Sequence, residues 1–433
     1  MIAPHAGLAA RLAAFLRRHP PGRRLCVGYS GGLDSTVLLH LLAGRRAEFD
    51  YQLGAVHVHH GLAAAADAWA THCQAVCAGL DIPLRVEHVA VQRTGQGLEA
   101  AAREARYRVF AGLAVDSLAL AHQRDDQAET VLLQLLRGAG LKGLAAMPEE
   151  RALGGIKLLR PLLATPRAEI EAYARERGLA WVEDASNADA TLRRNATRHH
   201  LLPAIEARFP GAARTLAEAA ERFAESARLL DDLAEIDAAG AADGLEVARL
   251  ARLEPARARN LLRHFLASRG ARIQRQRLHE ALAQMLEAAP DSEPMIAFGT
   301  MALRRHQGRL VLVGQPPSPQ STTWTWRGEA RLDLDAVGRL EFTPAPGAGA
   351  RLPAGATIRL RAGGEKLQPD ARRPARTLKN LLREAGVPPW WRERLPLIYV
   401  DGRLAWAAEI GADAAFMAGP DETGWVITWS RPD

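Results

Sequence analysis

Short apolar runs alternate with longer helix-like segments over about the first 200 residues of the chain. The runs that predict buried strands are 25–29, 54–59, 84–91 and 117–122. The segments that predict helices follow them, over 36–42, 64–80, 98–115 and about 126–137. Such an alternation predicts a parallel sheet with helices on both faces, in which ligands bind at the carboxyl ends of the strands.

The pattern changes after this region. From about 201 to 242 the chain is almost continuously amphipathic, which predicts a long helix, and an arginine-rich helical stretch follows. The segment 315–323 is proline-rich and is the clearest linker. The short β-like runs beyond it are 324–326, 331–334, 340–343 and 357–361, before a closing mixed segment. We therefore expect three domains, with bounds at 1–215, 216–315 and 324–433.

The hexapeptide Ser30-Gly31-Gly32-Leu33-Asp34-Ser35 joins the first predicted strand to the first predicted helix. Its glycines permit positive φ and close backbone approach, so the N–H groups of the turn and the helix start converge on an anion. Ser30 and Ser35 add hydroxyl donors, and Asp34 beside that anion makes sense if it holds a divalent cation. The segment predicts a pyrophosphate cradle, and the alternative is an ordinary glycine-rich turn with a serine cap. It is not a Walker A loop, because the lysine of that motif is missing.

Adjacent acids follow the strand predicted over 117–122. One carboxylate suffices to cap a helix, but Asp125 and Asp126 stand side by side and Glu129 lies one turn further along. This set indicates a cation or a cationic substrate.

Basic residues cluster in two other places of the first domain. Arg103 shares a helical face with Arg106 or Tyr107, and solvent-exposed salt bridging is the alternative to a binding role. The stretch 183–189 is polar and turn-prone, and the Arg-Arg-Asn sequence of 193–195 suits a phosphate or a base edge. A charged loop is the alternative there.

Composition narrows the class of protein. The 433 residues are 48% hydrophobic, yet no apolar run approaches the ~20 residues of a membrane span, and the first 20 residues lack a signal-peptide core. Three cysteines argue against a disulfide framework and for a reducing, cytoplasmic compartment, and we expect all three in the core. The net charge of +7 and the pI near 9.7 favour a polyanionic partner.

The downstream positive charge is concentrated in two stretches. Residues 249–277 contain nine arginines and one glutamate, and residues 359–394 contain ten lysines or arginines and four acids. A solvated helix face usually mixes both signs, so these stretches indicate contact with phosphates. Trp390 and Trp391 either stack on an exposed base or anchor a small β domain.

Several motifs in a fixed order carry a family resemblance. They are the hexapeptide, Val-His-Val-His-His-Gly-Leu at 56–62, Arg-Glu-Ala-Arg-Tyr at 103–107, Asp125-Asp126-Gln127-x-Glu129-Thr130, Asp184-x-Ser186-Asn187, Arg194-Asn195-x-x-Arg198 and Leu202-Pro203. The set resembles the tRNA(Ile)-lysidine synthetases, a family of PP-loop ATP pyrophosphatases. The stretch from Arg361 to Arg392 looks like that family's terminal domain, so the resemblance covers nearly the whole chain.

The resemblance implies a fold and a reaction. The fold would be α/β, with an N-terminal doubly wound parallel sheet of the PP-loop type, a mainly helical middle domain and a small mixed α/β C-terminal domain. The reaction would join free L-lysine to C2 of the wobble cytidine of a CAU-anticodon tRNA(Ile), through an adenylated cytidine, giving lysidine. ATP would be a substrate, Mg²⁺ a cofactor and the tRNA a partner, with no membrane involved. The oligomeric state stays open between monomer and homodimer.

The resemblance also assigns roles to residues. It implies that Asp34 holds magnesium, that Asp126 positions or deprotonates the amine of lysine, and that Arg194 stabilises the phosphate or the activated base. Arg103 or Arg106 would hold the lysine carboxylate. The residues implied in ATP binding are Ser30, Gly31, Gly32, Leu33, Asp34, Ser35 and His57, and those implied in tRNA binding are Arg198, Arg372, Arg373, Arg376 and Lys379.

Two positions depart from the family pattern. Many members carry histidine where this chain has Gln123, so that side chain cannot be a required acid or base here, and many carry arginine where it has Ala63. Two other functions stay open. A sulfur-inserting PP-loop tRNA modifier would need a C-x-x-C pair, which the chain lacks. A non-catalytic tRNA-binding protein would not need the intact Asp34, Asp126 and Arg194.

Overall fold

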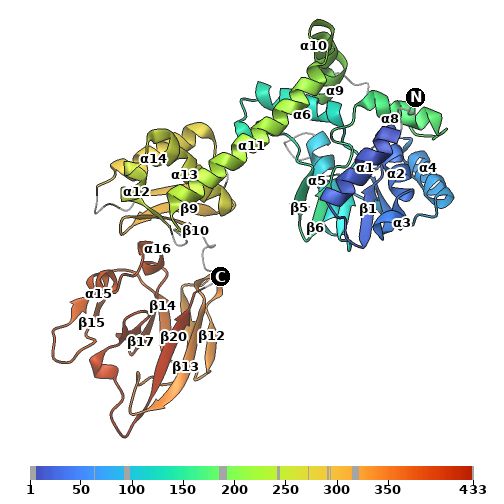
Figure 1. Ribbon diagram of the computed structural model, residues 1–433. Helices are drawn as coiled ribbons and strands as arrows, with labels where there is room; N and C mark the ends of the chain where they lie inside the picture. Colours follow the sequence, from blue (N-terminus) through green and yellow to red (C-terminus); the bar gives the residue numbers. More distant parts are fainter. Residues whose placement is uncertain are drawn as a thin grey trace. The chain divides into compact units, whose positions relative to one another are not determined.

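The computed structural model describes residues 6–62, 64–91, 98–184, 193–240, 244–271, 273–289, 292, 294–314 and 321–431. The chain forms two compact units, Met1–Asp232 and Leu233–Asp433 (Figure 1). The three domain bounds expected from the sequence stay predictions, because the division into compact units falls at another place. Among the described residues, no helix is both long enough and apolar enough to cross a membrane.

A six-stranded sheet forms the centre of the first unit. Its strand order is β3 (Leu84–His88), β2 (Gln52–His59), β1 (Arg24–Gly28), β4 (Ser117–Ala119), β6 (Ile156–Leu159) and β5 (Glu150–Leu153). Neighbouring strands are parallel except β5 and β6. The predicted parallel sheet is confirmed, and the antiparallel edge hairpin is an addition to it. The hairpin was missed because β5, with the sequence Glu-Arg-Ala-Leu, has no apolar run that marks a buried strand.

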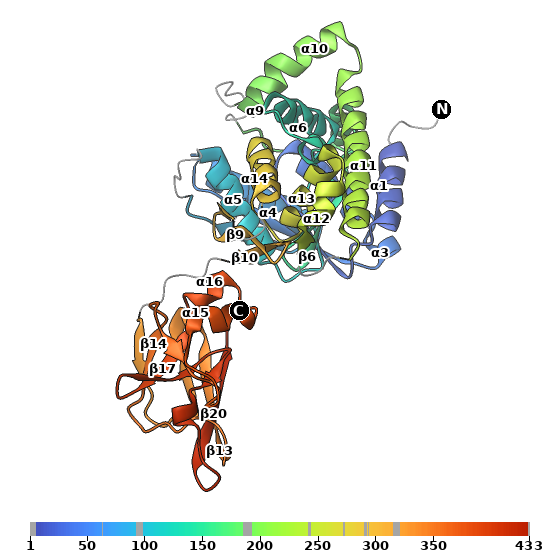
Figure 2. The same cartoon turned by 90° about the vertical axis from the view of Figure 1, so that its left-hand side faces the viewer.

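Helices cover both faces of this sheet, as Figures 1 and 2 show. The larger core cluster lies on one face, under α1 (Ala6–Arg18), α2 (Leu33–Ala43), α4 (Ala66–Gly79) and α8 (Arg167–Glu176). A smaller cluster lies on the other face, under α5 (Leu98–Ala111). The doubly wound arrangement is thereby confirmed. All three cysteines are buried and free, as expected.

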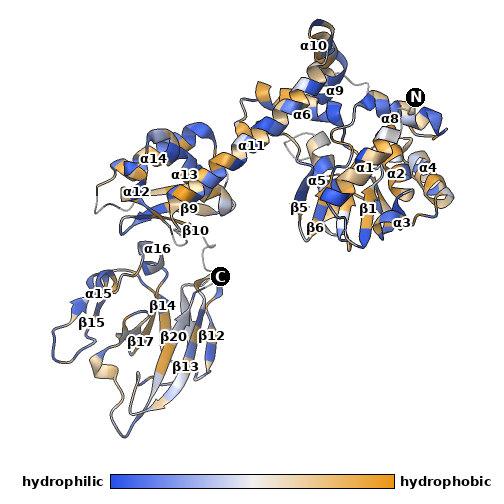
Figure 3. Ribbon diagram, viewed as in Figure 1, coloured by the Kyte–Doolittle hydropathy of each residue, from blue (hydrophilic) through white to orange (hydrophobic). Residues whose placement is uncertain are grey.

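The rest of the first unit is helical. Its elements are α3 (Arg46–Phe49), α6 (Arg124–Leu136), α7 (Leu141–Leu144), α9 (Arg193–Ala196), the π-helical turn η2 (Thr197–Leu201), α10 (Leu202–Arg208) and most of α11 (Ala212–Ala238), whose last residues belong to the second unit. The single helix predicted over 201–242 is wrong in one respect, because it breaks between α10 and α11. Pro210 has no N–H to donate, and Gly211 adopts a φ of +87° that ends a helix. The long α11 is amphipathic along its length (Figure 3).

The first part of the second unit packs three helices and a small sheet around one core. The helices are α12 (Val247–Arg252), α13 (Pro255–Ser268) and α14 (Arg275–Glu287), and the strand order is β7 (Leu245–Glu246), β10 (Arg309–Gly314), β9 (Met301–His306), β8 (Met295–Phe298). The mainly helical middle region is confirmed. The sheet was not predicted, because its strands are short and lie among residues with helix-like patterning.

The second part of this unit is a small mixed domain with its own core, as expected. Its strands form sheets in the orders β11 (Thr323–Thr325), β14 (Thr357–Leu360), β17 (Pro396–Val400), β18 (Arg403–Ala407), β19 (Gly411–Ala412); β12 (Arg331–Asp333), β13 (Arg339–Pro346), β20 (Thr423–Ser430); and β15 (Lys366–Leu367), β16 (Arg376–Thr377). Its helices are α15 (Leu378–Glu384), α16 (Pro389–Arg392) and the short turns η3 (Asp335–Val337) and η4 (Ala414–Phe416). The four predicted β-like runs are β11 to β14. Trp391 packs edge-on to Trp429 beside the core, which agrees with an anchoring role for this tryptophan.

Candidate active site

The turn between β1 and α2 is a backbone cradle at the carboxyl edge of the sheet. Gly31 has a φ of +83°, and a Cβ at this position would lie 3.0 Å from both Cys73 Sγ and a methyl carbon of Val182. Only glycine fits this place without strain. The Gly31 carbonyl accepts a hydrogen bond from the Val182 N–H at 2.9 Å, so a distant segment holds the turn in shape.

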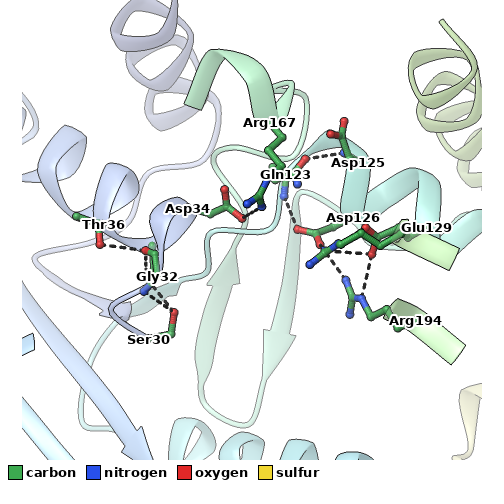
Figure 4. Close-up of polar contacts among 12 residues, drawn as sticks. Ser30, Gly32, Asp34, Thr36, Gln123, Asp125, Asp126, Glu129, Arg167 and Arg194 are labelled. Carbon is green, nitrogen blue, oxygen red and sulfur yellow. Dashed lines mark hydrogen bonds and ion pairs between the residues drawn. The ribbon is translucent and has the colours of Figure 1, made fainter. Parts of the chain in front are cut away.

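Hydroxyl groups line this cradle and hold its carbonyls (Figure 4). Ser35 Oγ donates to the Gly32 carbonyl at 3.0 Å and lies 3.0 Å from Ser30 Oγ, which accepts from the Gly32 N–H at 3.3 Å. Thr36 Oγ1 also donates to the Gly32 carbonyl, at 3.0 Å. The sequence folds this way because α2 is almost entirely apolar and buried, so its polar first turn alone faces the cradle. The first N–H groups of α2 point out of the helix and make the cradle an anion site.

Asp34 lies in the first turn of α2, beside the cradle. Its Oδ1 is buried and has no hydrogen-bond partner among the described residues, and its Oδ2 lies 3.5 Å from a guanidinium nitrogen of Arg167. Burial raises the pKa of Asp34 to about 6. The nearby carboxylates of Asp126 and Asp125 add to this rise, while Arg167 opposes it. A carboxylate that is buried and short of positive charge is suited to take a cation.

The orphaned oxygen of Asp34 tests whether a magnesium ion fits. Carboxylate oxygen is the ligand that Mg²⁺ prefers, and Mg²⁺ is usually held by one or two carboxylates together with phosphates of the substrate. Among the described residues, no three acidic, histidine or cysteine side chains gather into a ready metal cage. The residues present therefore fit an ion that arrives with a nucleotide, and they do not form a permanent metal centre.

The start of α6 holds the acidic pair in a capping arrangement. Gln123 Oε1 accepts from the Asp125 N–H at 2.6 Å, and the Gln123 N–H donates to Asp126 Oδ2 at 3.1 Å, which together form a capping box. Gln123 is completely buried. Its side chain thus caps a helix, which agrees with the expectation that it serves neither as an acid nor as a base.

Four charged side chains from distant segments meet at α6, and we name them the ion cluster: Asp126, Glu129, Arg194 and Arg198. Arg194 donates to Asp126 Oδ1 at 3.0 Å and to Glu129 Oε2 at 3.2 Å (Figure 4). Arg198 donates to Asp126 Oδ1 at 2.7 Å and to Glu129 Oε1 at 2.6 Å. The exposed fractions of the Asp126 and Glu129 side chains are only 9% and 1%.

The local helix geometry aligns the two arginines of the ion cluster. Arg194 lies in α9 and Arg198 in η2, four residues later, so their side chains lie on one face of the continuous helix. Burial alone would raise the pKa of Asp126. The guanidinium charges of Arg194 and Arg198, with the hydrogen bond from the Gln123 N–H, outweigh burial and hold that pKa below its usual value. Asp126 is therefore ionised and occupied in this arrangement.

The other residues predicted for the catalytic domain lie in different settings. His57 is buried, and its Nδ1 donates to the Tyr29 carbonyl at 3.0 Å, at the strand end before the cradle. Burial lowers the pKa of His57, so the ring is neutral. Arg103 is exposed and stacks on the Tyr107 ring at 5.1 Å. Arg106 is half-buried. Burial lowers the pKa of His60, and the positive charge of Arg106 lowers it further. Arg106 therefore lies near His60, which follows the end of β2.

The residues predicted to bind tRNA fall in two places. Arg198 belongs to the ion cluster, whereas the others surround β16 and α15 in the second unit. Arg376 is held by Glu384, with one nitrogen-to-oxygen distance of 2.9 Å, and Arg373 lies 3.6 Å from Asp370. Arg372 and Lys379 are exposed. No acidic partner contacts either of these two side chains within the described part of the chain.

Some positions lie outside this description or were missed. Ser186, Asn187 and Ala63, which belong to predicted motifs or departures, lie outside the described residues. Arg167 was not predicted as a site residue, because it sits in an amphipathic helix far from every motif and only the fold brings it to Asp34. Glu129 was noted as part of an acidic set, and its near-complete burial could not be read from spacing.

Three family models match this chain. A PP-loop domain matches residues 5–205, a TilS substrate binding domain matches 245–311, and a TilS substrate C-terminal domain matches 356–429.

Curated relatives match almost the full length. The tRNA(Ile)-lysidine synthase of Nitrosomonas europaea is 44% identical over 422 residues, covering 94% of this chain and 92% of that protein. The tRNA(Ile)-lysidine synthase of Pseudomonas aeruginosa is 43% identical over 448 residues, covering 99% and 98%. Among solved structures, the crystal structure of a TilS C-terminal domain is similar, with 17% identity and a TM-score of 0.22, over 26% of this chain and 98% of that domain.

Proposed function

Since the chain belongs to the tRNA(Ile)-lysidine synthase family, whose members are ATP-using tRNA-modifying ligases, we propose that it joins free L-lysine to C2 of the wobble cytidine of a CAU-anticodon tRNA(Ile). The product, lysidine, changes the codon and the amino-acid identity of the tRNA from methionine to isoleucine. The observation that carries this proposal is that the ion cluster lies beside the nucleotide cradle, near enough for Asp126 and Arg198 to shift the pKa of Asp34 (Figure 4). Transfer of lysine to an adenylated base needs carboxylates that bind the lysine ammonium next to the activated base.

The first half-reaction activates the base. The C2 oxygen of the cytidine attacks the α-phosphorus of ATP, the bond from that phosphorus to the bridging oxygen breaks, and pyrophosphate leaves with the electron pair. The backbone N–H groups of the cradle, with Ser30 and Ser35, bind the phosphates and stabilise their negative charge. His57 keeps the strand end in place behind the cradle, through its hydrogen bond to the Tyr29 carbonyl.

Asp34 would hold a magnesium ion over the phosphates. The ion would supply positive charge to the leaving pyrophosphate. The fit rests on the buried, unpartnered Oδ1 and on the raised pKa of Asp34, both of which favour acceptance of a cation.

The second half-reaction uses the ion cluster. The ε-ammonium of lysine is a cation of the same charge as an arginine, so it can take the place of Arg194 or Arg198 on Asp126 and Glu129. The displaced guanidinium then turns to the anionic adenylate. Arg106, on the side of the strand ends, is better placed than Arg103 to receive the carboxylate of lysine.

This exchange would also make the Asp126 carboxylate basic enough to accept a proton from lysine. While both arginines contact Asp126, their charge holds its pKa low and the carboxylate cannot accept a proton at neutral pH. Once one guanidinium turns to the adenylate, burial weighs more and the pKa of Asp126 rises. Asp126 can then take a proton from the lysine ammonium, and the free amine attacks C2 and displaces AMP.

We propose that the second unit binds the phosphates of the tRNA. Four arginines of the middle region, Arg249, Arg252, Arg259 and Arg275, have no acidic partner among the described residues. In the last domain the same holds for Arg372 and Lys379. Guanidinium and ammonium groups that no carboxylate neutralises suit the phosphates of RNA.

The burial of the cysteines argues against a sulfur-inserting tRNA modifier. Burial raises the pKa of Cys26 and of Cys73 to about 12, and that of Cys77 to about 11. A persulfide carrier needs an accessible thiolate at neutral pH. None of these three thiols meets that requirement.

One assay tests the proposal directly. The protein is incubated with a tRNA(Ile) transcript carrying a CAU anticodon, ATP, magnesium and labelled lysine, and a tRNA(Met) transcript with the same anticodon serves as the control. We expect label in the tRNA(Ile) alone. Omission of lysine with α-labelled ATP should leave AMP on the RNA. Binding of tRNA without either label would support the non-catalytic alternative.

A further inference from the structure

Arg167 is the first residue of α8, and its side chain points across the site to Asp34 (Figure 4). Its nitrogen-to-oxygen distance from Asp34 Oδ2 is 3.5 Å. Among the described residues, it is the one cationic side chain within 4 Å of this carboxylate. The contact is long, and within the described part of the chain it is the one ion pair of this guanidinium, so most of its five N–H donors remain open to a ligand.

The backbone of Arg167 is fixed relative to both halves of the site. The loop before it is bound to the start of α6, because the Arg124 N–H donates to the Thr165 carbonyl at 3.0 Å, and Thr165 is buried. The helix after it is bound to α2, where Tyr173 contacts His40 with its hydroxyl 2.9 Å from His40 Nδ1. The side chain itself is 46% exposed, so it is free to move from a rigid base.

We propose that Arg167 binds the β- and γ-phosphoryl groups of ATP and the pyrophosphate that leaves in the first half-reaction. This rests on the proposed function, since it assumes that ATP occupies the cradle.

The electrostatics of the site require such a move. A cation that binds Asp34 repels the guanidinium beside it, unless an anion lies between the two positive charges. The phosphoryl groups of ATP are the anion that the cradle is built to hold. Arg167 then exchanges one weak contact with a carboxylate for several charge-assisted hydrogen bonds to phosphate oxygens. Its charge neutralises the pyrophosphate as the bond to the α-phosphorus breaks.

The test compares Arg167→Ala and Arg167→Lys with Arg175→Ala. Arg175 is an exposed arginine on the same helix, paired with Glu171 at 2.5 Å, and it serves as the matched control. Binding of magnesium pyrophosphate and of AMP to each protein is measured by calorimetry, without tRNA or lysine. The KM for ATP is then measured in the full reaction, and circular dichroism checks the fold.

We expect Arg167→Ala to weaken pyrophosphate binding and to raise the KM for ATP by about 10- to 100-fold, the range for hydrogen bonds to charged groups. AMP binding should change less than twofold, because AMP lacks the outer phosphates. Arg167→Lys should recover part of the loss, and Arg175→Ala should match the wild type. Unchanged pyrophosphate binding in a folded Arg167→Ala protein overturns the proposal, as does an equal loss for pyrophosphate and AMP. A wild-type protein that binds pyrophosphate but makes no lysidine contradicts the proposed function alone.

Discussion

Asp34 shows how a single residue can serve function at the expense of stability. Its carboxyl is buried, a guanidinium nitrogen of Arg167 lies 3.5 Å from it, and two further acids lie near it. The folded state therefore prefers the protonated form, with a pKa of about 6 against an ordinary value of 3.8. Because the folded pKa is the higher one, the contribution of Asp34 to stability is fully present below about pH 4 and is lost as the pH rises to about 6.

We therefore expect Asp34→Asn to stabilise the protein at pH 7.5 and to inactivate it. The difference in pKa corresponds to a gain in the free energy of unfolding of at most about 3 kcal/mol, and this gain should vanish below pH 4. The adenylation rate should fall by about 10²- to 10³-fold, as for loss of one organised electrostatic group. Urea denaturation at the two pH values and release of pyrophosphate check the two effects. A variant that is no more stable than the wild type at pH 7.5 would show that Asp34 is already neutralised.

The two arginines left open by the sequence differ in their surroundings. Arg103 is exposed and stacks on Tyr107, while Arg106 is half-buried and is electrostatically coupled to His60 and His122. Because the coupling is with residues at the strand ends, we expect Arg106→Ala to raise the KM for lysine by about tenfold or more. Arg103→Ala is the matched control and should change it less than twofold. Steady-state kinetics with varied lysine decide between them, and the reverse ranking would assign the lysine carboxylate to Arg103.

At the scale of elements, the fold was predictable where one physical signal dominates. The strand–turn–helix of 25–42 was found because an apolar run, two glycines and a buried helix agree with one another. The cradle was found from this agreement, and β11 to β14 were found from short β-like runs beyond the proline-rich segment. The acidic pair was found because two carboxylates stand side by side where one suffices to cap a helix.

Elements that depend on tertiary contacts were not predictable. β5 is a strand because it pairs with β6. The sheet of the middle region packs against helices, and in that region only the helices show a clear pattern of apolar and polar residues. The ion cluster joins α6 to α9 and η2, more than 60 residues apart in sequence, so spacing gave no sign that the arginines would contact Asp126 and Glu129. Arg167 was missed for the same reason.

The ion pairs made by α9 and η2 lead us to expect that ATP binds before lysine. Its arginines occupy both carboxylates, so lysine should bind weakly until an anionic nucleotide draws them away. Equilibrium dialysis of labelled lysine should show binding by the wild type only with a non-hydrolysable ATP analogue. Arg198→Ala should bind lysine without the analogue, because one competing cation is gone. Equal binding by the wild type with and without the analogue would contradict the exchange.

At the scale of the whole molecule, the net charge is +7, and the arginines of the two units differ in how many are paired with acids. Many arginines of the first unit are paired with acids, for example Arg24 with Asp116 and Arg11 with Glu169. In the second unit several are not, and those around α15 lie in a domain with a core of its own. That core runs from Trp326 to Ile427, so a truncation that removes the whole domain must begin before Trp326.

Removal of residues 321–433 should leave the cradle folded and weaken tRNA binding. The remaining chain keeps the separate cores of the first unit and of the middle region, so ATP binding should persist. In the full chain, Arg372→Glu with Lys379→Glu should mimic the truncation, because neither side chain has an acidic partner among the described residues. Each lost phosphate contact lowers the slope of log affinity against log salt by about 0.7–0.9. Arg331→Glu, on an exposed residue paired with Glu341 at 3.3 Å, is the control. The affinity of each of the four proteins for tRNA is measured over a series of salt concentrations. A slope that is unchanged in both the truncation and the double reversal would mean that this surface does not bind RNA.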